Sequence, residues 1–178
     1  TILTIAPSAL SQDVVWVGTD DGRVQVTSAG GGQWYDVTGG MGRVPDSTWV
    51  AHIEASKFRV GGAFAVFDDH RRGNWEPYIY RTDDYGDDWD RIADADDIDG
   101  FVHTLEQDPH AENLLFAGTE FGLYVTFNGG DDWLKWTHGI PSVPVRSLVI
   151  HPRDHDLVIG THGRAIYVLD DIRPLREL

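Results

Sequence analysis

The sequence has no cysteine, only two lysines, one methionine and no long apolar run. Without cysteine, neither a disulfide framework nor a thiolate metal site can form. No apolar stretch approaches the roughly 20 residues that a transmembrane helix needs, so we expect no membrane span. Because few lysines accompany many aspartates, the net charge is −15. Such a surface repels polyanions, and nucleic acid is therefore not an expected partner.

An internal repeat is visible once the tryptophans are aligned. Three eight-residue segments, 27–34, 82–89 and 126–133, share a threonine first, a glycine fifth and a tryptophan eighth. Strand-like sequence ending in Gly-Thr comes before two of them, at 14–19 and 114–119, and occurs again at 157–161. Gly118 and Gly160 are 42 residues apart, a period that suits units of four short strands.

The repeat predicts an all-β fold made of β-propeller blades. We expect about four antiparallel blades, at about 2–38, 48–93, 101–137 and 145–171, forming one segment of a larger propeller. The last blade is expected to be incomplete, because sequence for only three strands follows residue 145. Helical periodicity is absent.

Each eight-residue segment has the composition of a tight turn that leads into an outer strand. The fifth-position glycine permits a positive φ, and a short side chain at the third position can accept from free backbone N–H groups. Asp84 and Asn128 can do this and Ala29 cannot, so we expect the first turn to be held by its glycines alone and to be the most mobile. The tryptophan that follows is expected to pack against the neighbouring sheet.

The spacing Ser/Thr-x-Asp-x-Gly-x-x-Trp resembles the Asp-box, or BNR, repeat of sialidases, xyloglucanases and sortilin-type receptors. Segments 18–24, 78–86, 118–123 and 160–164, followed by Asp-Asp-Ile-Arg-Pro-Leu at 170–175, resemble the closing blades of large bacterial sortilin-like proteins that carry a glycosyl hydrolase label. The resemblance implies a propeller and an extracellular, periplasmic or cell-surface location. The arginine cluster and Tyr/Glu pair of sialidases are not recognisable, and no Cys-rich module follows, so the resemblance brings no catalytic residue to this chain.

The turns that join second and third strands are expected to meet on one face and to form the binding site. In the second blade a charged loop, 67–77, replaces the short turns of the other blades, and such loops on rigid scaffolds often carry function. The candidate residues are Asp20, Asp21, Asp68, Asp69, His70, Arg71, Arg72, Trp75, Glu120, His162 and Arg164.

Several chemistries remain open for these side chains. Two carboxylates about 5–10 Å apart can hydrolyse a glycoside, and Asp68 or Asp69 with Asp20, Asp21 or Glu120 is the pairing to test. Acidic residues at hairpin turns are also ordinary turn chemistry. No histidine spacing typical of a metal site is present, so no cofactor is expected, with calcium on the acidic side chains as the alternative.

Other titratable residues are expected to have structural roles. His103, His151 and His155 lie near predicted strand ends and are expected to make surface hydrogen bonds. Glu54 and Glu106 occupy equivalent places on adjacent inner strands, where they are expected to line a wet central channel, a buried functional acid being the alternative.

The function that these features favour is non-catalytic binding of a protein or glycan through the loop face. One alternative is a glycoside hydrolase in which these blades form one wall of a cleft, and another is a structural subunit of a cell-surface assembly. Because a three-stranded last blade leaves an unpaired edge, we expect further blades of the same protein, or a second copy of the chain, to cover the open ends.

Overall fold

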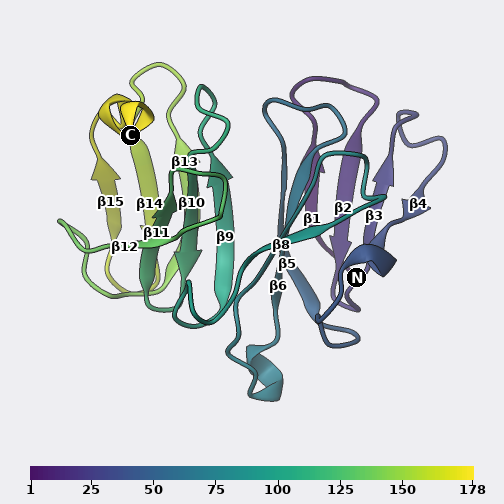
Figure 1. Ribbon diagram of the computed structural model, residues 1–178, viewed down its shortest axis with the longest axis horizontal. Coiled ribbons are helices and arrows are strands. Elements are labelled where there is room, and N and C mark those ends of the chain that lie inside the picture. Colours follow the sequence, from purple (N-terminus) through teal and green to yellow (C-terminus); the bar gives the residue numbers. More distant parts are fainter.

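The computed structural model describes all 178 residues as four antiparallel sheets and three short 3-10 helices (Figure 1). Within each sheet, strands that follow one another in the chain are hydrogen-bonded neighbours. We call the sheets blades 1 to 4. No helix is long and apolar enough to cross a membrane.

The strands of blade 1 are β1 (Ile2–Pro7), β2 (Val15–Thr19), β3 (Val24–Thr27) and β4 (Tyr35–Asp36). Those of blade 2 are β5 (Trp49–Ala55), β6 (Ala63–Asp68), β7 (Tyr78–Thr82) and β8 (Asp90–Ala93). Those of blade 3 are β9 (Val102–Gln107), β10 (Leu115–Thr119), β11 (Gly122–Thr126) and β12 (Leu134–Trp136). Blade 4 has only β13 (Val145–Ile150), β14 (Leu157–Thr161) and β15 (Ile166–Leu169). The helices are η1 (Thr38–Gly40), η2 (His70–Arg72) and η3 (Arg173–Glu177).

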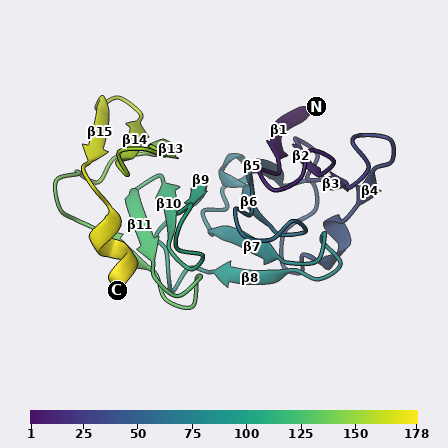
Figure 2. The same cartoon turned by 90° about the horizontal axis from the view of Figure 1, so that it is seen from above.

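The blades are arranged on an arc, with the first strand of each on the inside. Figure 2 shows this arc from above, with blade 1 and blade 4 at its two ends. Along it, β1 contacts β5, β5 contacts β9, and β9 contacts β13. The predicted all-β blades with an incomplete last member are therefore confirmed.

The apolar core lies between the blades, because alternate side chains of each strand face opposite neighbours. One cluster joins blades 1 and 2 and includes Trp16 and Trp89, whose rings meet edge to face with centroids 6.0 Å apart. A second joins blades 2 and 3 around Leu105 and Trp133. The third joins blades 3 and 4 and contains Phe116. Each blade is thus stabilised by its neighbours.

Two glycines of the repeat allow the inner strand of the next blade to come close. A Cβ placed on Gly18 would stand 2.4 Å from the side chain of Val50 on β5. One on Gly118 would stand 2.7 Å from Val145 on β13. Real Cβ atoms do not approach other atoms this closely, so the Gly-Thr ending of these strands reflects blade packing.

The tryptophans of the second and third eight-residue segments join successive blades, and their expected packing is confirmed. Trp89 is 8% exposed and donates from Nε1 to the backbone oxygen of Val37 at 3.1 Å. Trp133 is 7% exposed and donates in the same way to Ile92 at 2.7 Å. In both cases the acceptor directly follows, or lies in, the fourth strand of the preceding blade.

The turns before these tryptophans are held by side-chain acceptors. The backbone N–H of Asp88 donates to Asp84, and the equivalent N–H of Asp132 donates to Asn128, both as expected. The expectation that glycines alone hold the first turn is wrong. In the first turn the hydroxyl of Thr27 accepts from two backbone N–H groups. The first-position threonines of the other turns also accept from backbone N–H groups. All three turns begin with threonine, so this hydroxyl acceptor is present whatever residue occupies the third position.

After β15 the chain packs against blade 3 instead of forming a fourth strand. Ile172 is 1% exposed within the apolar cluster of blades 3 and 4. From η3, Arg176 forms an ion pair at 2.9 Å with Asp108, whose side chain is fully buried. This pair and Ile172 fix the last turn of the chain to the turn between β9 and β10.

Candidate functional site

The turns after the second strands and the connections between blades lie at the same end of the sheets, which we call the loop face. The loop between β6 and β7 is the longest second-to-third-strand turn, and its helix η2 extends beyond the sheets in Figure 1. Two features stand beside this loop. One is a group of aromatic side chains, and the other is an acidic pocket.

Ionic contacts fix the first half of the loop to the rest of the loop face. Asp69 is 6% exposed and accepts from the side chains of Arg72 and Asn74. Arg72 also donates to the backbone oxygen of Asp46 and to the hydroxyl of Thr48, each at 2.8 Å. Asp69 and Arg72 therefore hold the loop in place.

The remaining charged groups of the loop contact the strands of blade 2. The guanidinium of Arg71 lies over the ring of Trp49, 3.8 Å from its centroid. Glu76 forms an ion pair with Arg91 on β8 at 2.7 Å. The loop is thus fixed at both ends, and a rigid loop loses little entropy when it binds a partner.

Three aromatic side chains, Trp75, Phe101 and Phe121, form what we call the aromatic cluster. The rings of Trp75 and Phe121 are nearly parallel, with centroids 6.1 Å apart, although they come from different blades. Trp75 meets Phe101 edge to face, and the His70 ring stacks on Phe101 at 4.5 Å. Trp75 is 51% exposed and Phe121 is 42% exposed. The cluster therefore presents apolar surface to solvent.

A charged group lies next to the aromatic cluster. His103 Nε2 is 3.0 Å from a carboxylate oxygen of Glu120. His103 Nδ1 is 3.1 Å from a guanidinium nitrogen of Arg146. Burial lowers the pKa of His103, against the opposing effects of Glu120 and Asp68. The expectation that His103 is a surface residue is wrong, because its side chain is only 5% exposed and is covered by Phe101 and these charged groups.

The first carboxylate of the loop is also hydrogen-bonded. Asp68 accepts from the backbone N–H and the ring of His70, at 2.9 and 2.7 Å. Asp68 and Glu120, one of the expected carboxylate pairs, both favour the charged form of His103 and so oppose the lowering of its pKa by burial.

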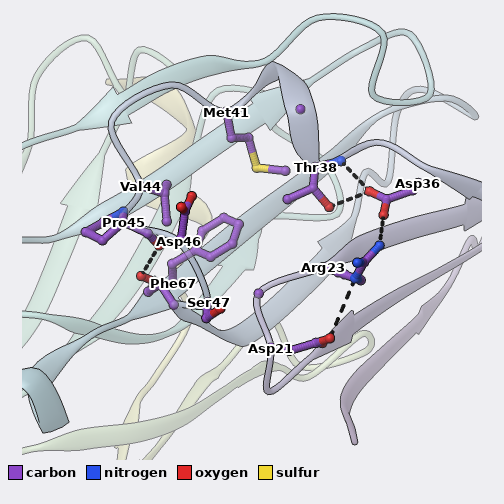
Figure 3. A pocket seen from close by; sticks show the side chains of 13 residues that line it. Asp21, Arg23, Asp36, Thr38, Met41, Val44, Pro45, Asp46, Ser47 and Phe67 are labelled. Atoms are coloured by element: carbon purple, nitrogen blue, oxygen red, sulfur yellow. Dashed lines mark hydrogen bonds and ion pairs between the residues drawn. The ribbon is translucent and has the colours of Figure 1, made fainter.

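The acidic pocket is a cavity of about 400 Å³ beside the same loop (Figure 3). Three acidic residues, Asp21, Asp36 and Asp46, line it together with one basic residue, Arg23. Arg23 is 2.8 Å from Asp36 and 3.6 Å from Asp21. The apolar part of the wall comes from Met41, Val44 and Phe67. With three carboxylates and one guanidinium, the lining suits a cationic group.

The other candidate residues lie apart from the aromatic cluster. Asp20 is partly exposed at the start of the β2–β3 turn, where its backbone N–H donates to the backbone oxygen of Thr1 at 2.9 Å. His162 is exposed and uses its backbone N–H to contact Pro144. Arg164 is exposed in the β14–β15 turn. Asp21 belongs to the acidic pocket.

Glu54 and Glu106 face the inside of the arc, where a lysine joins them. Lys57 Nζ lies 2.7 Å from Glu54 and 2.9 Å from Glu106, which are on the inner strands of blades 2 and 3. Burial and the nearby Glu54 raise the pKa of Glu106. Burial opposes the charge on Lys57, but the two carboxylates outweigh it and raise the lysine pKa. A cavity of about 370 Å³ opens beside this group.

Sequence reasoning missed Phe101, Phe121 and Arg146. Phe121 occupies a turn where blade 1 has aspartate, and this replacement was the signal that could have identified it. Phe101 and Arg146 lie near the starts of inner strands, and nothing local marks them as neighbours of the loop. No group of three or more histidine, aspartate or glutamate side chains is arranged to hold a metal ion.

Comparisons with known proteins identify the fold. No family model matches the sequence, and no curated protein matches it. The structure is similar to YCF48 bound to D1 peptide, with 17% identity and a TM-score of 0.66, over 97% of this chain and 52% of that one. It is also similar to the GH74 xyloglucanase from Xanthomonas campestris, with 15% identity and a TM-score of 0.75, over 96% of this chain and 29% of that one. The computationally designed Ika4 protein aligns over 96% of this chain and 91% of its own, with 17% identity and a TM-score of 0.61.

These neighbours support a β-propeller. The chain spans about half the length of YCF48 and less than a third of the xyloglucanase. At these identities the likeness shows the fold alone.

Proposed function

We propose that this chain is a non-catalytic segment of a larger, exported Asp-box propeller, related to bacterial sortilin-like proteins, and that it binds a protein through its loop face. The observation that carries the proposal is the aromatic cluster. Trp75 and Phe121 are exposed and stacked on each other, and Trp75 lies in a loop whose ends are ion-paired. Exposed aromatic side chains on a rigid support are the usual anchors of a protein interface.

Charge favours a basic partner segment. The net charge of −15 attracts positive groups over the whole surface and accelerates their association. The acidic pocket next to the loop has room for a lysine or arginine side chain. In this proposal the partner places an apolar residue on the aromatic cluster and a cationic residue in the pocket. YCF48, one of the structural neighbours, has been solved with a peptide bound.

The contacts of Asp68 and Glu120 support binding over glycoside hydrolysis. A hydrolase needs one carboxylate to protonate the leaving oxygen and a second one free to act on the sugar or on water. Asp68 already accepts from His70, and Glu120 is held by His103 and Arg146. Both carboxylates therefore have protein partners that a sugar would have to displace.

The test uses two probe sets, arginine- and lysine-containing peptides and neutral glucan and xyloglucan oligosaccharides. The variants are Trp75→Ala, Phe121→Ala and the replacement of residues 68–76 by the short turn of blade 3. Trp75→Ala and Phe121→Ala should keep their melting temperatures within a few degrees, because both side chains are about half exposed. The loop replacement also removes the buried Asp69, so its folding is checked by far-UV circular dichroism before binding is measured. We expect the peptides to bind the native chain and affinity to fall at least about tenfold in each variant, as for an interface anchor.

Phe58→Ala provides the matched control. Phe58 is also an exposed aromatic residue, 36% exposed, but it lies in the β5–β6 turn at the opposite end of the sheets. Its loss should leave peptide affinity unchanged. Binding of the oligosaccharides alone would replace the protein partner by a glycan, and their hydrolysis would establish the enzyme. Peptide binding that all loop-face variants retain would place the site elsewhere.

A further inference from the structure

Two tyrosines depart from the repeat. The residue after the segment tryptophan is Tyr35 in blade 1, but it is aspartate in blade 2 and leucine in blade 3. The fourth residue of the segment is Tyr85 in blade 2, whereas Gly30 and Gly129 occupy this place in the other two segments. Tyr35 is 49% exposed and Tyr85 is 39% exposed. Burial in the core therefore explains neither departure.

Tyr85 has a backbone conformation that suits glycine better. Its φ is +63°, and the equivalent Gly30 and Gly129 have φ values of +59° and +78°. A residue with a Cβ atom rarely adopts this left-handed conformation, because the Cβ comes too close to the following carbonyl oxygen. Tyr85 is held there by Gly61, whose backbone oxygen accepts from its N–H at 2.8 Å and whose backbone lies against its ring. Strained positions held in this way occur most often at binding and active sites.

Both tyrosines line one groove at the outer rim between blades 1 and 2, which we call the tyrosine groove. Its volume is about 370 Å³. Tyr35 belongs to β4, the outermost strand of blade 1 in Figure 2, and Tyr85 to the turn between β7 and β8. Val26 and Val37 form the apolar part of the lining. The backbone oxygen of Val37 accepts from Trp89, so the junction of the two blades fixes this part of the groove.

The tyrosine groove carries negative charge and no positive side chain. Asp36 and Asp87 line it, and no lysine, arginine or histidine does. Asp36 also lines the acidic pocket and pairs with Arg23 at 2.8 Å, so part of its charge is already neutralised. Asp87 does not line that pocket. The electron-rich faces of tyrosine rings attract cations as well, so the charge and the aromatic groups of the groove favour the same kind of ligand.

We propose that the tyrosine groove binds a small quaternary ammonium ion of the choline type. The tyrosine rings and the carboxylate of Asp87 stabilise its positive charge, and the two valines contact its methyl groups. A primary ammonium ion is strongly hydrated and loses more hydration against an apolar lining. A neutral sugar can stack on a tyrosine ring but gains nothing from the charge of Asp87. The groove contains no residue of the aromatic cluster, so this inference does not rest on what that cluster binds.

The first measurement compares four probes on the native chain. They are choline, its neutral isostere with a tert-butyl group in place of the trimethylammonium group, ethanolamine and methyl glucoside. Calorimetry gives the affinities, and NMR follows the methyl protons, whose signals shift upfield over aromatic rings. We expect choline to bind at least about tenfold more tightly than the other three probes. Equal binding of the neutral isostere or of ethanolamine, binding of the glucoside alone, or no binding of choline would each overturn the proposal.

The second measurement uses variants that change one part of the groove each. Tyr85→Gly introduces the residue of the other two segments, and Tyr35→Leu introduces that of blade 3. Both are expected to fold, which far-UV circular dichroism checks. Loss of either ring should weaken choline binding about two- to thirtyfold, the range of a cation–π contact. Asp87→Asn should weaken it too and should reduce its dependence on salt concentration, because less charge remains to be screened.

Trp34→Ala is the matched control. Trp34 directly precedes Tyr35 and is 41% exposed, but it does not line the groove, so its loss should leave choline affinity unchanged. Equal weakening in this control, or unchanged affinity in both tyrosine variants, would refute the proposal. Asp46 lines only the acidic pocket. Choline affinity that falls in Asp46→Asn but is retained in Tyr85→Gly would place the cation in that pocket and overturn the proposal, whether or not peptides bind the loop face.

Discussion

Replacing Trp133 with alanine removes the side chain that joins blade 3 to blade 2. Its ring is 93% buried in the cluster that contains Leu105, and its Nε1 donates to Ile92 at 2.7 Å. A buried tryptophan removes on the order of 200 Å² from water, worth about 5 kcal/mol at 25 cal/mol per Å². The alanine methyl group retains part of this burial energy, so we expect the free energy of unfolding to fall by about 3–5 kcal/mol.

The hydrogen bond is measured separately by Trp133→Phe. This variant keeps most of the apolar ring but leaves the backbone oxygen of Ile92 without its donor, which costs about 1–3 kcal/mol. Trp34→Ala is the matched control, because Trp34 occupies the same place in the repeat but is 41% exposed and contacts no preceding blade. Trp34→Ala should lower the free energy of unfolding by less than about 1 kcal/mol.

Calorimetry and far-UV circular dichroism are the suitable assays, since removal of a tryptophan alters fluorescence directly. For a chain of this size each kcal/mol lowers the melting temperature by about 2–4 °C, so Trp133→Ala should melt about 6–20 °C below the native chain. Trp34→Ala should melt within about 4 °C of it. Equal losses at Trp34 and Trp133 would refute the inference that contact with the preceding blade gives the tryptophan its effect.

Two further predictions concern ionisable groups. Lys57→Met should lower the free energy of unfolding by more than about 1 kcal/mol, because Glu54 and Glu106 would then face each other without a cation. Lys135→Met is the control, because Lys135 is exposed and its loss should change the free energy of unfolding little. Similar urea midpoints for the two variants would contradict this. Burial lowers the pKa of His103 below its usual 6.5, so the unfolded chain binds that proton more readily than the folded protein. The stability due to the neutral ring is therefore complete above about pH 6.5 and is lost as the pH falls through the folded-state pKa. His103→Gln should flatten the fall in melting temperature between about pH 7 and pH 5, and an unchanged profile would exclude His103 as its cause.

The strand order could be predicted because every unit repeats the same local signals. At Gly18 and Gly118 a side chain would collide with the next inner strand. The glycine in the strand sequence therefore indicates close packing between blades. The tryptophan of each turn was expected to pack on a neighbouring sheet for the same reason. The sequence could not show whether each tryptophan packs on the preceding or the following blade, because the repeat pattern is the same in both cases.

The candidate site was predicted only where its residues lie in one loop. His70 and Trp75 share the β6–β7 connection and Asp68 ends β6 directly before it, and the length and charge of this segment made it visible in the sequence. Phe101 and Arg146 reach the same region from the beginnings of blades 3 and 4, and only the curvature of the arc brings them there. Contacts between distant segments of a repeat depend on this curvature, which no local pattern encodes.

The direction of the tryptophan bonds has a consequence for how the chain acquires its fold during synthesis. In each bond the donor lies C-terminal to the acceptor, by 52 residues for Trp89 and Val37 and by 41 for Trp133 and Ile92. A ribosome adds about 5–20 residues per second, so a finished blade waits roughly 2–10 s before the next tryptophan can reach it. During that interval its forward apolar face is exposed to other nascent chains. We therefore expect assembly to proceed from the N-terminal blades, each new blade covering the one made before it, so that the most recently completed blade is the one most exposed to aggregation.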